Sequence, residues 1–78
     1  MREYLIGLRT KIGLTQQEVA NKLLISQNYL SLIESGNRQE DLKLSTIKGF
    51  SKVYDVTVEY LIQQEIEYQN YLKAGNKE

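Results

Sequence analysis

The sequence predicts an all-α domain of five helices, and three features lead to this prediction. First, apolar residues recur at helical spacing in successive segments of the chain. Second, residues that favour helix starts, including Thr15 and Ser26, stand directly before several of these segments. Third, Gly13 and Gly36 stand where two segments end, and Gly accepts the left-handed conformation that often follows a helix.

Two helices are expected in the first third of the chain. The first covers residues 3–12, and its inward side repeats at i, i+3 and i+7 through Leu5, Leu8 and Ile12. The second covers residues 16–23 and opens with a capping box, in which Thr15 caps the helix and Glu18 reaches back to the Thr15 backbone N–H.

The third expected helix, residues 27–35, has two chemically different sides. Leu30 and Ile33 face inward. The other side is uncharged and consists of amides and hydroxyls, with Leu32 at its border: Gln27, Asn28, Ser31 and Ser35. A merely solvated helix usually carries Lys and Glu there, whereas short amides and hydroxyls pair with base edges in a major groove. This side therefore indicates DNA reading.

Two further helices complete the domain. Ser45 is expected to cap a fourth helix over residues 46–54, which closes the core with Ile47, Phe50 and Tyr54. Thr57 caps the fifth helix, which continues to about Leu72 because no Gly interrupts it before Gly75.

The fifth helix carries more apolar surface than a lone domain of 78 residues needs. Six side chains lie within about 160° of arc on its helical wheel: Val58, Leu61, Ile62, Ile66, Tyr68 and Leu72. The second half of this stripe has no evident partner in the chain, so we expect it to pack against a second copy. The residues expected at that interface are Ile62, Ile66, Tyr68 and Leu72. Local packing of a frayed helix is the alternative.

These elements divide the chain into two parts. Residues 1–62 form the expected helix-turn-helix domain, and residues 63–78 form a C-terminal helical extension with a frayed end.

Composition argues against several classes of function. The chain has no Cys or His, its five Gly residues form no phosphate-binding loop, and no pair of carboxylates shares an apolar face. We therefore expect no enzymatic activity, no metal, no cofactor and no small-molecule ligand. The absence of long apolar runs and of a signal-peptide region predicts a soluble, unprocessed cytoplasmic protein.

The net charge is zero but unevenly distributed. Residues 1–54 hold eight Lys or Arg against five Asp or Glu, whereas residues 55–78 hold two against five. The first part is therefore +3 and the second −3. Such a domain presents a positive face to DNA, with weaker and more salt-sensitive binding than a strongly basic protein.

Residues 14–36 resemble the helix-turn-helix of the phage repressor and Cro family, also called XRE-type regulators. The family pattern is approximately L-T-Q-x-x-[LV]-A-x-x-x-x-[IV]-S-x-x-x-[IL]-S-x-[IL]-E-x-G. Twelve positions match it: Leu14, Thr15, Gln16, Val19, Ala20, Ile25, Ser26, Leu30, Ser31, Ile33, Glu34 and Gly36. The looser similarity extends over about residues 2–62. It implies a transcriptional regulator that reads a pseudo-palindromic operator in double-stranded DNA as a homodimer.

The resemblance also implies roles for individual residues. The base-reading positions are Gln27, Asn28, Ser31 and Leu32. The residues expected to contact phosphate are Gln16, Thr15, Tyr29, Arg38 and Lys43, and Gln16 is further expected to brace Gln27. Arg9 is expected to pair internally with Glu34. Leu24 departs from the family, because many members have Gly there, so either the turn is strained or the second helix ends differently.

A second function remains open on the sequence alone. The same fold serves as a protein-interaction module, such as an antitoxin or anti-repressor, and here the acidic, Tyr-rich tail would bind the partner. Zero net charge and the apolar Leu32 favour this alternative modestly. Packing without any contact to DNA also explains Leu32 and Tyr29.

Overall fold

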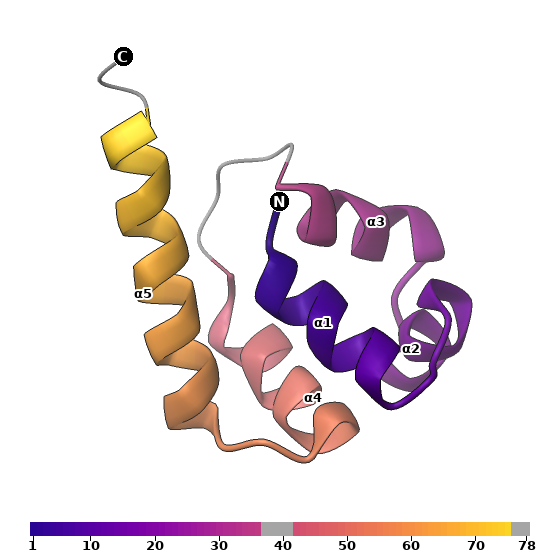
Figure 1. The fold of residues 1–78 in the computed structure, drawn as a ribbon. Coiled ribbons are helices and arrows are strands. Elements are labelled where there is room, and N and C mark those ends of the chain that lie inside the picture. Colours follow the sequence, from indigo (N-terminus) through magenta and orange to yellow (C-terminus); the bar gives the residue numbers. More distant parts are fainter. Residues whose placement is uncertain (37–41, 76–78) are drawn as a thin grey trace.

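The structure, a computed structural model, describes residues 1–36 and 42–75. These residues form five helices and no strand, which confirms the predicted all-α class. In chain order they are α1 (Glu3–Lys11), α2 (Gln16–Leu23), α3 (Gln27–Ser35), α4 (Leu44–Tyr54) and α5 (Val58–Gly75). Figure 1 shows α5 along one side of the domain and α2 and α3 on the other. Across the described residues, no helix has the length and apolar character needed to cross a membrane.

Most helix ends follow the predicted chemistry. Thr15 Oγ1 accepts from the Glu18 backbone N–H at 3.1 Å, and the Glu18 carboxylate accepts from the Thr15 N–H at 2.9 Å, which completes the capping box. Ser26 Oγ accepts from the Tyr29 N–H at 3.0 Å. Gly36 follows α3 with φ +72°, the left-handed conformation that Gly adopts without steric cost.

One predicted helix boundary is wrong. The fourth helix begins at Leu44, before Ser45, because the extended Lys43 already accepts the first helical hydrogen bond from the Ile47 N–H at 3.0 Å. Ser45 therefore lies inside the first turn and caps nothing. The fifth helix does continue to Leu72, as predicted, and it ends at Gly75.

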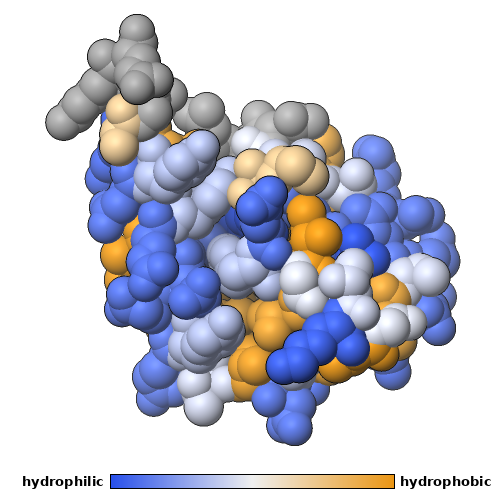
Figure 2. Space-filling view, in the orientation of Figure 1, coloured by the Kyte–Doolittle hydropathy of each residue, from blue (hydrophilic) through white to orange (hydrophobic). Residues whose placement is uncertain are grey.

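All five helices contribute to one core. The side chains buried together are Leu5, Val19, Ala20, Leu30, Ile33, Ile47, Phe50, Tyr54 and Leu61. Ala20 is fully buried, and its small side chain lets a neighbouring helix approach α2 closely. The rings of Phe50 and Tyr54 stack with their centroids 5.6 Å apart. On the face drawn in Figure 2, apolar side chains reach the surface in patches, mostly toward the middle and between hydrophilic ones.

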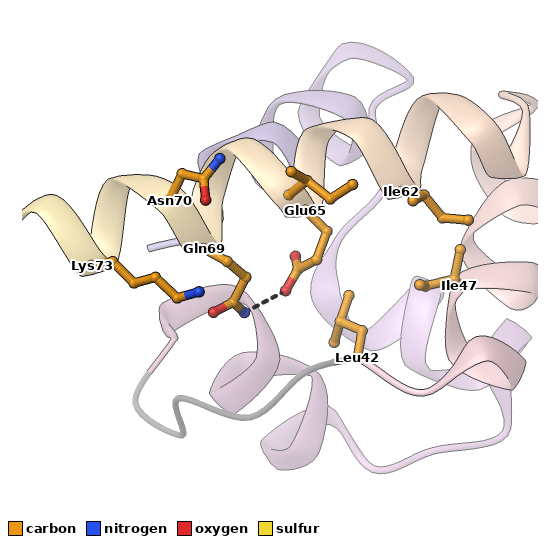
Figure 3. A pocket seen from close by; sticks show the side chains of 8 residues that line it. Leu42, Ile47, Ile62, Glu65, Gln69, Asn70 and Lys73 are labelled. Carbon is orange, nitrogen blue, oxygen red and sulfur yellow. Dashed lines mark hydrogen bonds between the residues drawn. The ribbon is translucent and has the colours of Figure 1, made fainter.

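The long α5 helix borders a groove on one side, and on another side its Tyr68 is buried. The groove is lined by Leu42, Ile47, Ile62, Glu65, Ile66, Gln69, Asn70 and Lys73 (Figure 3). Ile62 is 38% exposed and Ile66 is 48% exposed. Tyr68 is only 9% exposed, and its ring lies over the Arg2 guanidinium at 4.9 Å. The prediction that Tyr68 lacks a partner within its own chain is therefore wrong.

Candidate nucleic-acid interface

The uncharged side of α3 faces outward. Gln27 and Asn28 are exposed, and Ser31 and Leu32 are half-buried. The opposite side of the helix is anchored in the core by Leu30 and Ile33. Of the four side chains predicted to read bases, Gln27 and Asn28 are therefore open to solvent, and Ser31 and Leu32 are partly so.

The turn between α2 and α3 sets the angle at which α3 is presented. Leu24 has φ 59° and ψ 40°, so this residue adopts the left-handed conformation that Gly accepts at little steric cost. The Leu24 N–H donates to the Asn21 carbonyl at 3.3 Å, and the Ile25 N–H donates to the Ala20 carbonyl at 3.0 Å. These two bonds are the Schellman pattern that ends a helix at a left-handed residue. Of the two alternatives, the strained turn is the one present, with the Leu24 side chain 91% exposed.

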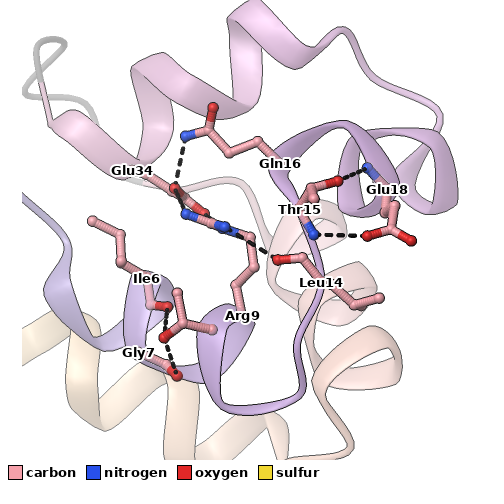
Figure 4. A network of polar contacts seen from close by, with 9 residues as sticks. Ile6, Gly7, Arg9, Leu14, Thr15, Gln16, Glu18 and Glu34 are labelled. Atoms are coloured by element: carbon pink, nitrogen blue, oxygen red, sulfur yellow. Dashed lines mark hydrogen bonds and ion pairs between the residues drawn. The ribbon is translucent and has the colours of Figure 1, made fainter.

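A polar network joins α1, α2 and α3 behind this surface (Figure 4). The predicted Arg9–Glu34 pair is present: Arg9 Nε and Nη2 donate to the Glu34 carboxylate at 2.8 and 3.1 Å. Arg9 Nη1 also donates to the Leu14 carbonyl at 3.1 Å. The hydrogen bond to Glu34 raises the pKa of Arg9, and the Glu34 side chain is 2% exposed. The pair fixes how α1 meets α3.

Gln16, which the resemblance predicts to brace Gln27, belongs to the same network. Its Nε2 donates to Glu34 Oε1 at 2.9 Å, so one N–H of this amide is held by Glu34. An amide nitrogen carries two hydrogens, so a second N–H and the carbonyl oxygen of Gln16 remain for a ligand. Gln16 is half-buried at the first position of α2.

The other predicted phosphate contacts are spread around α3. Thr15 is exposed, and its hydroxyl accepts from the Glu18 N–H while keeping its own proton to donate. The Thr15 backbone N–H donates to the Glu18 carboxylate and so lowers the pKa of Glu18. Tyr29 is 38% exposed, and Lys43 is exposed at the start of α4. Arg38 lies outside the described residues.

Sequence reasoning missed a second buried ion pair. Arg2 Nη2 lies 2.9 Å from Glu65 Oε2, with the two side chains 2% and 10% exposed. The two residues are 63 positions apart, so no spacing in the sequence links them. The sequence does show an Arg directly before the first helix, but it does not indicate the partner of that Arg. No group of three or more metal-ligating side chains occurs within residues 1–36 and 42–75.

The geometry defines a helix-turn-helix domain: two short helices cross through a tight left-handed turn, and the second presents an uncharged polar side. The sequence pattern of the helix-turn-helix family matches residues 5–61, and the chain belongs to the XRE-type branch of this family.

The chain is also similar to the HTH-type transcriptional regulator ImmR of Bacillus subtilis (strain 168), with 37% identity over 70 residues. The match covers 88% of this chain and 54% of ImmR, so the chain spans about half the length of this relative. No solved structure matches the chain significantly.

Proposed function

We propose that this chain is a sequence-specific DNA-binding transcriptional regulator, which inserts α3 into the major groove of a pseudo-palindromic operator. The observation that carries the proposal is the outward, uncharged side of α3, whose reverse side is anchored in the core. The family and the name of its relative, a transcriptional regulator, support the same function.

The side chains of α3 suit particular base edges. Gln27 and Asn28 are exposed, and each amide can pair bidentately with N6 and N7 of adenine. Ser31 can donate to or accept from a base, and Leu32 can contact a thymine methyl group. We thus assign the reading of bases to two amides, one hydroxyl and one apolar side chain.

Phosphate contacts are assigned to the start of α2 and its surroundings. The backbone N–H groups at a helix start have no partner inside the helix and lie at the positive end of its dipole, which favours phosphate. Thr15 and Gln16 stand at this start, and Tyr29, Lys43 and Arg38 are the remaining proposed contacts.

The exposed charges of the described residues favour DNA more than the total charge does. The exposed lysines between residues 1 and 54 are Lys11, Lys22, Lys43, Lys48 and Lys52, whereas the exposed acids described there are Glu3 and Glu18. Within this part, the two ion pairs engage Arg2, Arg9 and Glu34, and the fourth member, Glu65, lies on α5. The described surface of this part is therefore basic, which supports binding that weakens as salt rises.

The proposed regulator acts as a homodimer through the groove beside α5. Ile62 and Ile66 expose apolar surface there, and Leu72 is half-buried further along the helix. A two-fold axis would place two α3 helices on half-sites about one DNA turn, roughly 34 Å, apart. Sedimentation velocity tests this: Ile66→Glu should shift a dimer to monomer, and Gln63→Glu, which is outside the groove, should not. A monomeric wild type at tens of micromolar would contradict the dimer.

DNA binding is tested by selecting duplexes from a randomised pool and measuring affinity by fluorescence anisotropy during a salt titration. Each bidentate amide–base pair is worth about 1–3 kcal/mol, so Gln27→Ala and Asn28→Ala should each weaken binding about 5- to 150-fold. Gln63→Ala, an exposed amide on α5, is the control and should bind as the wild type does. Failure to enrich any duplex would overturn the proposal.

The competing protein-interaction function has less support. Two members of its acidic, Tyr-rich surface, Glu65 and Tyr68, are buried inside the domain. Tyr60 and Tyr71 remain exposed on α5, at 44% and 72%.

A further inference from the structure

The carboxyl end of α3 is held by a residue outside the interface described above. An α-helix leaves its last four carbonyl groups without partners inside the helix. In α3, Arg2 Nη1 donates to the Ile33 carbonyl at 2.8 Å, and the Arg2 backbone N–H donates to the Glu34 carbonyl at 2.8 Å. The guanidinium charge also stabilises the negative end of the helix dipole. Arg2, near the start of the chain, therefore caps the carboxyl end of α3.

Arg2 is in turn fixed by α5. Its Nε donates to Glu65 Oε1 and its Nη2 donates to Glu65 Oε2, both at 2.9 Å. Arg2 is 1% exposed, and the Tyr68 ring covers its guanidinium. A two-pronged pair of this kind fixes direction as well as distance, so Arg2 cannot turn unless α5 moves.

The Glu65 carboxylate receives two further hydrogen bonds. Tyr4 donates to Oε1 at 2.6 Å, and Gln69 Nε2 donates to Oε2 at 2.9 Å (Figure 3 shows the second). Burial alone would raise the pKa of Glu65, but hydrogen bonds from Arg2, Tyr4 and Gln69 outweigh it and lower the pKa below its ordinary value. The carboxylate therefore stays charged at neutral pH and holds Arg2 in place.

Gly36 brings the end of α3 into direct contact with α5. A Cβ atom at this position would collide with the Tyr68 hydroxyl. Gly36 thus suits both the left-handed φ and this close approach.

We infer that Arg2 and Glu65 are positioning residues for the base-reading helix, and that the docking of α5 sets the direction of α3 through them. The inference rests on the proposed function. Arg9 and Gln16 hold the Glu34 side chain, whereas Arg2 holds the carbonyl groups at the helix end. Displacement of the C-terminal half of α5 should therefore loosen the end of α3 and lower DNA affinity, although α5 itself reads no base.

The test compares Glu65→Gln with Glu67→Gln, an exposed glutamate on the same helix, by amide hydrogen exchange in NMR. In Glu65→Gln, the amides of residues 33–36 should exchange about tenfold faster or more, while those of α2 keep their wild-type protection. Glu67→Gln should change neither set. Equal acceleration in α2 and α3 would show a contribution to global stability alone and would overturn the inference, as would unchanged exchange at residues 33–36.

Tyr4→Phe provides a second variant in case Glu65→Gln does not fold. It removes one donor to Glu65 without leaving a buried charge unpaired, so a smaller acceleration is expected at the same amides. No change there, in a folded Tyr4→Phe protein, would also overturn the inference.

Affinity for the selected duplex is the second readout. Glu65→Gln should weaken binding about tenfold, a usual size for coupling between separate sites, and Glu67→Gln should not. Faster exchange with unchanged affinity would refute a positioning role in DNA reading. If the wild type binds no duplex, the proposed function fails, whereas the exchange data still decide whether α5 positions α3.

Discussion

Replacing Arg9 by Met tests how strongly the network of α1, α2 and α3 holds the domain together. The change leaves the Glu34 carboxylate, which is 2% exposed, without its charged partner. Removing one member of a buried ion pair costs about 3–5 kcal/mol, and the 15% exposure of Arg9 places this pair near the lower value, about 3 kcal/mol. Because a domain of 78 residues has a total stability of about 4–12 kcal/mol, Arg9→Met should remove a large part of it.

The double variant Arg9→Met, Glu34→Leu separates the loss of the pair from the cost of an unpaired charge. Apolar replacements of both partners are often neutral, so the double variant should return to within about 1 kcal/mol of the wild type in urea unfolding. It should nevertheless bind DNA less well, because Gln16 loses the carboxylate that holds its amide. The reasoning is refuted if the double variant is as unstable as Arg9→Met, or if Arg9→Met costs less than about 1 kcal/mol.

Three further predictions concern other parts of the domain. Leu24→Gly should raise stability by about 0.5–1 kcal/mol, or about 2–8 °C in thermal melting, because it relieves a left-handed Leu whose side chain is 91% exposed. Leu24→Ala keeps the Cβ and should change little, so equal effects of the two would exclude backbone strain. Tyr54→Phe should leave urea stability within about 1 kcal/mol or raise it, because the buried hydroxyl has no hydrogen-bond partner among the described residues. The stability advantage of wild type over Glu65→Gln should be full above pH 4.5 and disappear as pH falls through the lowered pKa of Glu65; an advantage that persists in acid would contradict this.

Local chemistry made much of the fold predictable. The capping residues Thr15 and Ser26 act within three residues of the groups they satisfy, so their partners can be identified along the sequence. The boundary at Ser45 failed because Lys43, which has no side-chain cap, already had the extended conformation and the first helical hydrogen bond. Capping propensity was outweighed there by the path of the chain into α4.

The candidate site was predictable where the family resemblance supplied a partner, and less so elsewhere. Arg9 and Glu34 are 25 residues apart, and only the resemblance connected them. The contact of Arg2 with Glu65 and Tyr68 joins the two ends of the domain, and no local spacing indicates it. An apolar stripe on a helical wheel gave Tyr68 the same role as Ile66, although Tyr68 covers a guanidinium inside the domain. Helical phase alone cannot distinguish the surfaces that a chain buries within itself from those that it offers to a partner.

The most direct test is a scan of single base-pair changes in the selected duplex, measured for wild type and for Asn28→Ala. If the outward side of α3 reads bases, Asn28→Ala should lose discrimination at one position, keep it at the others, and leave the slope of log affinity against log salt unchanged. Uniform weakening at every position, or binding indistinguishable from wild type, would contradict base reading by α3.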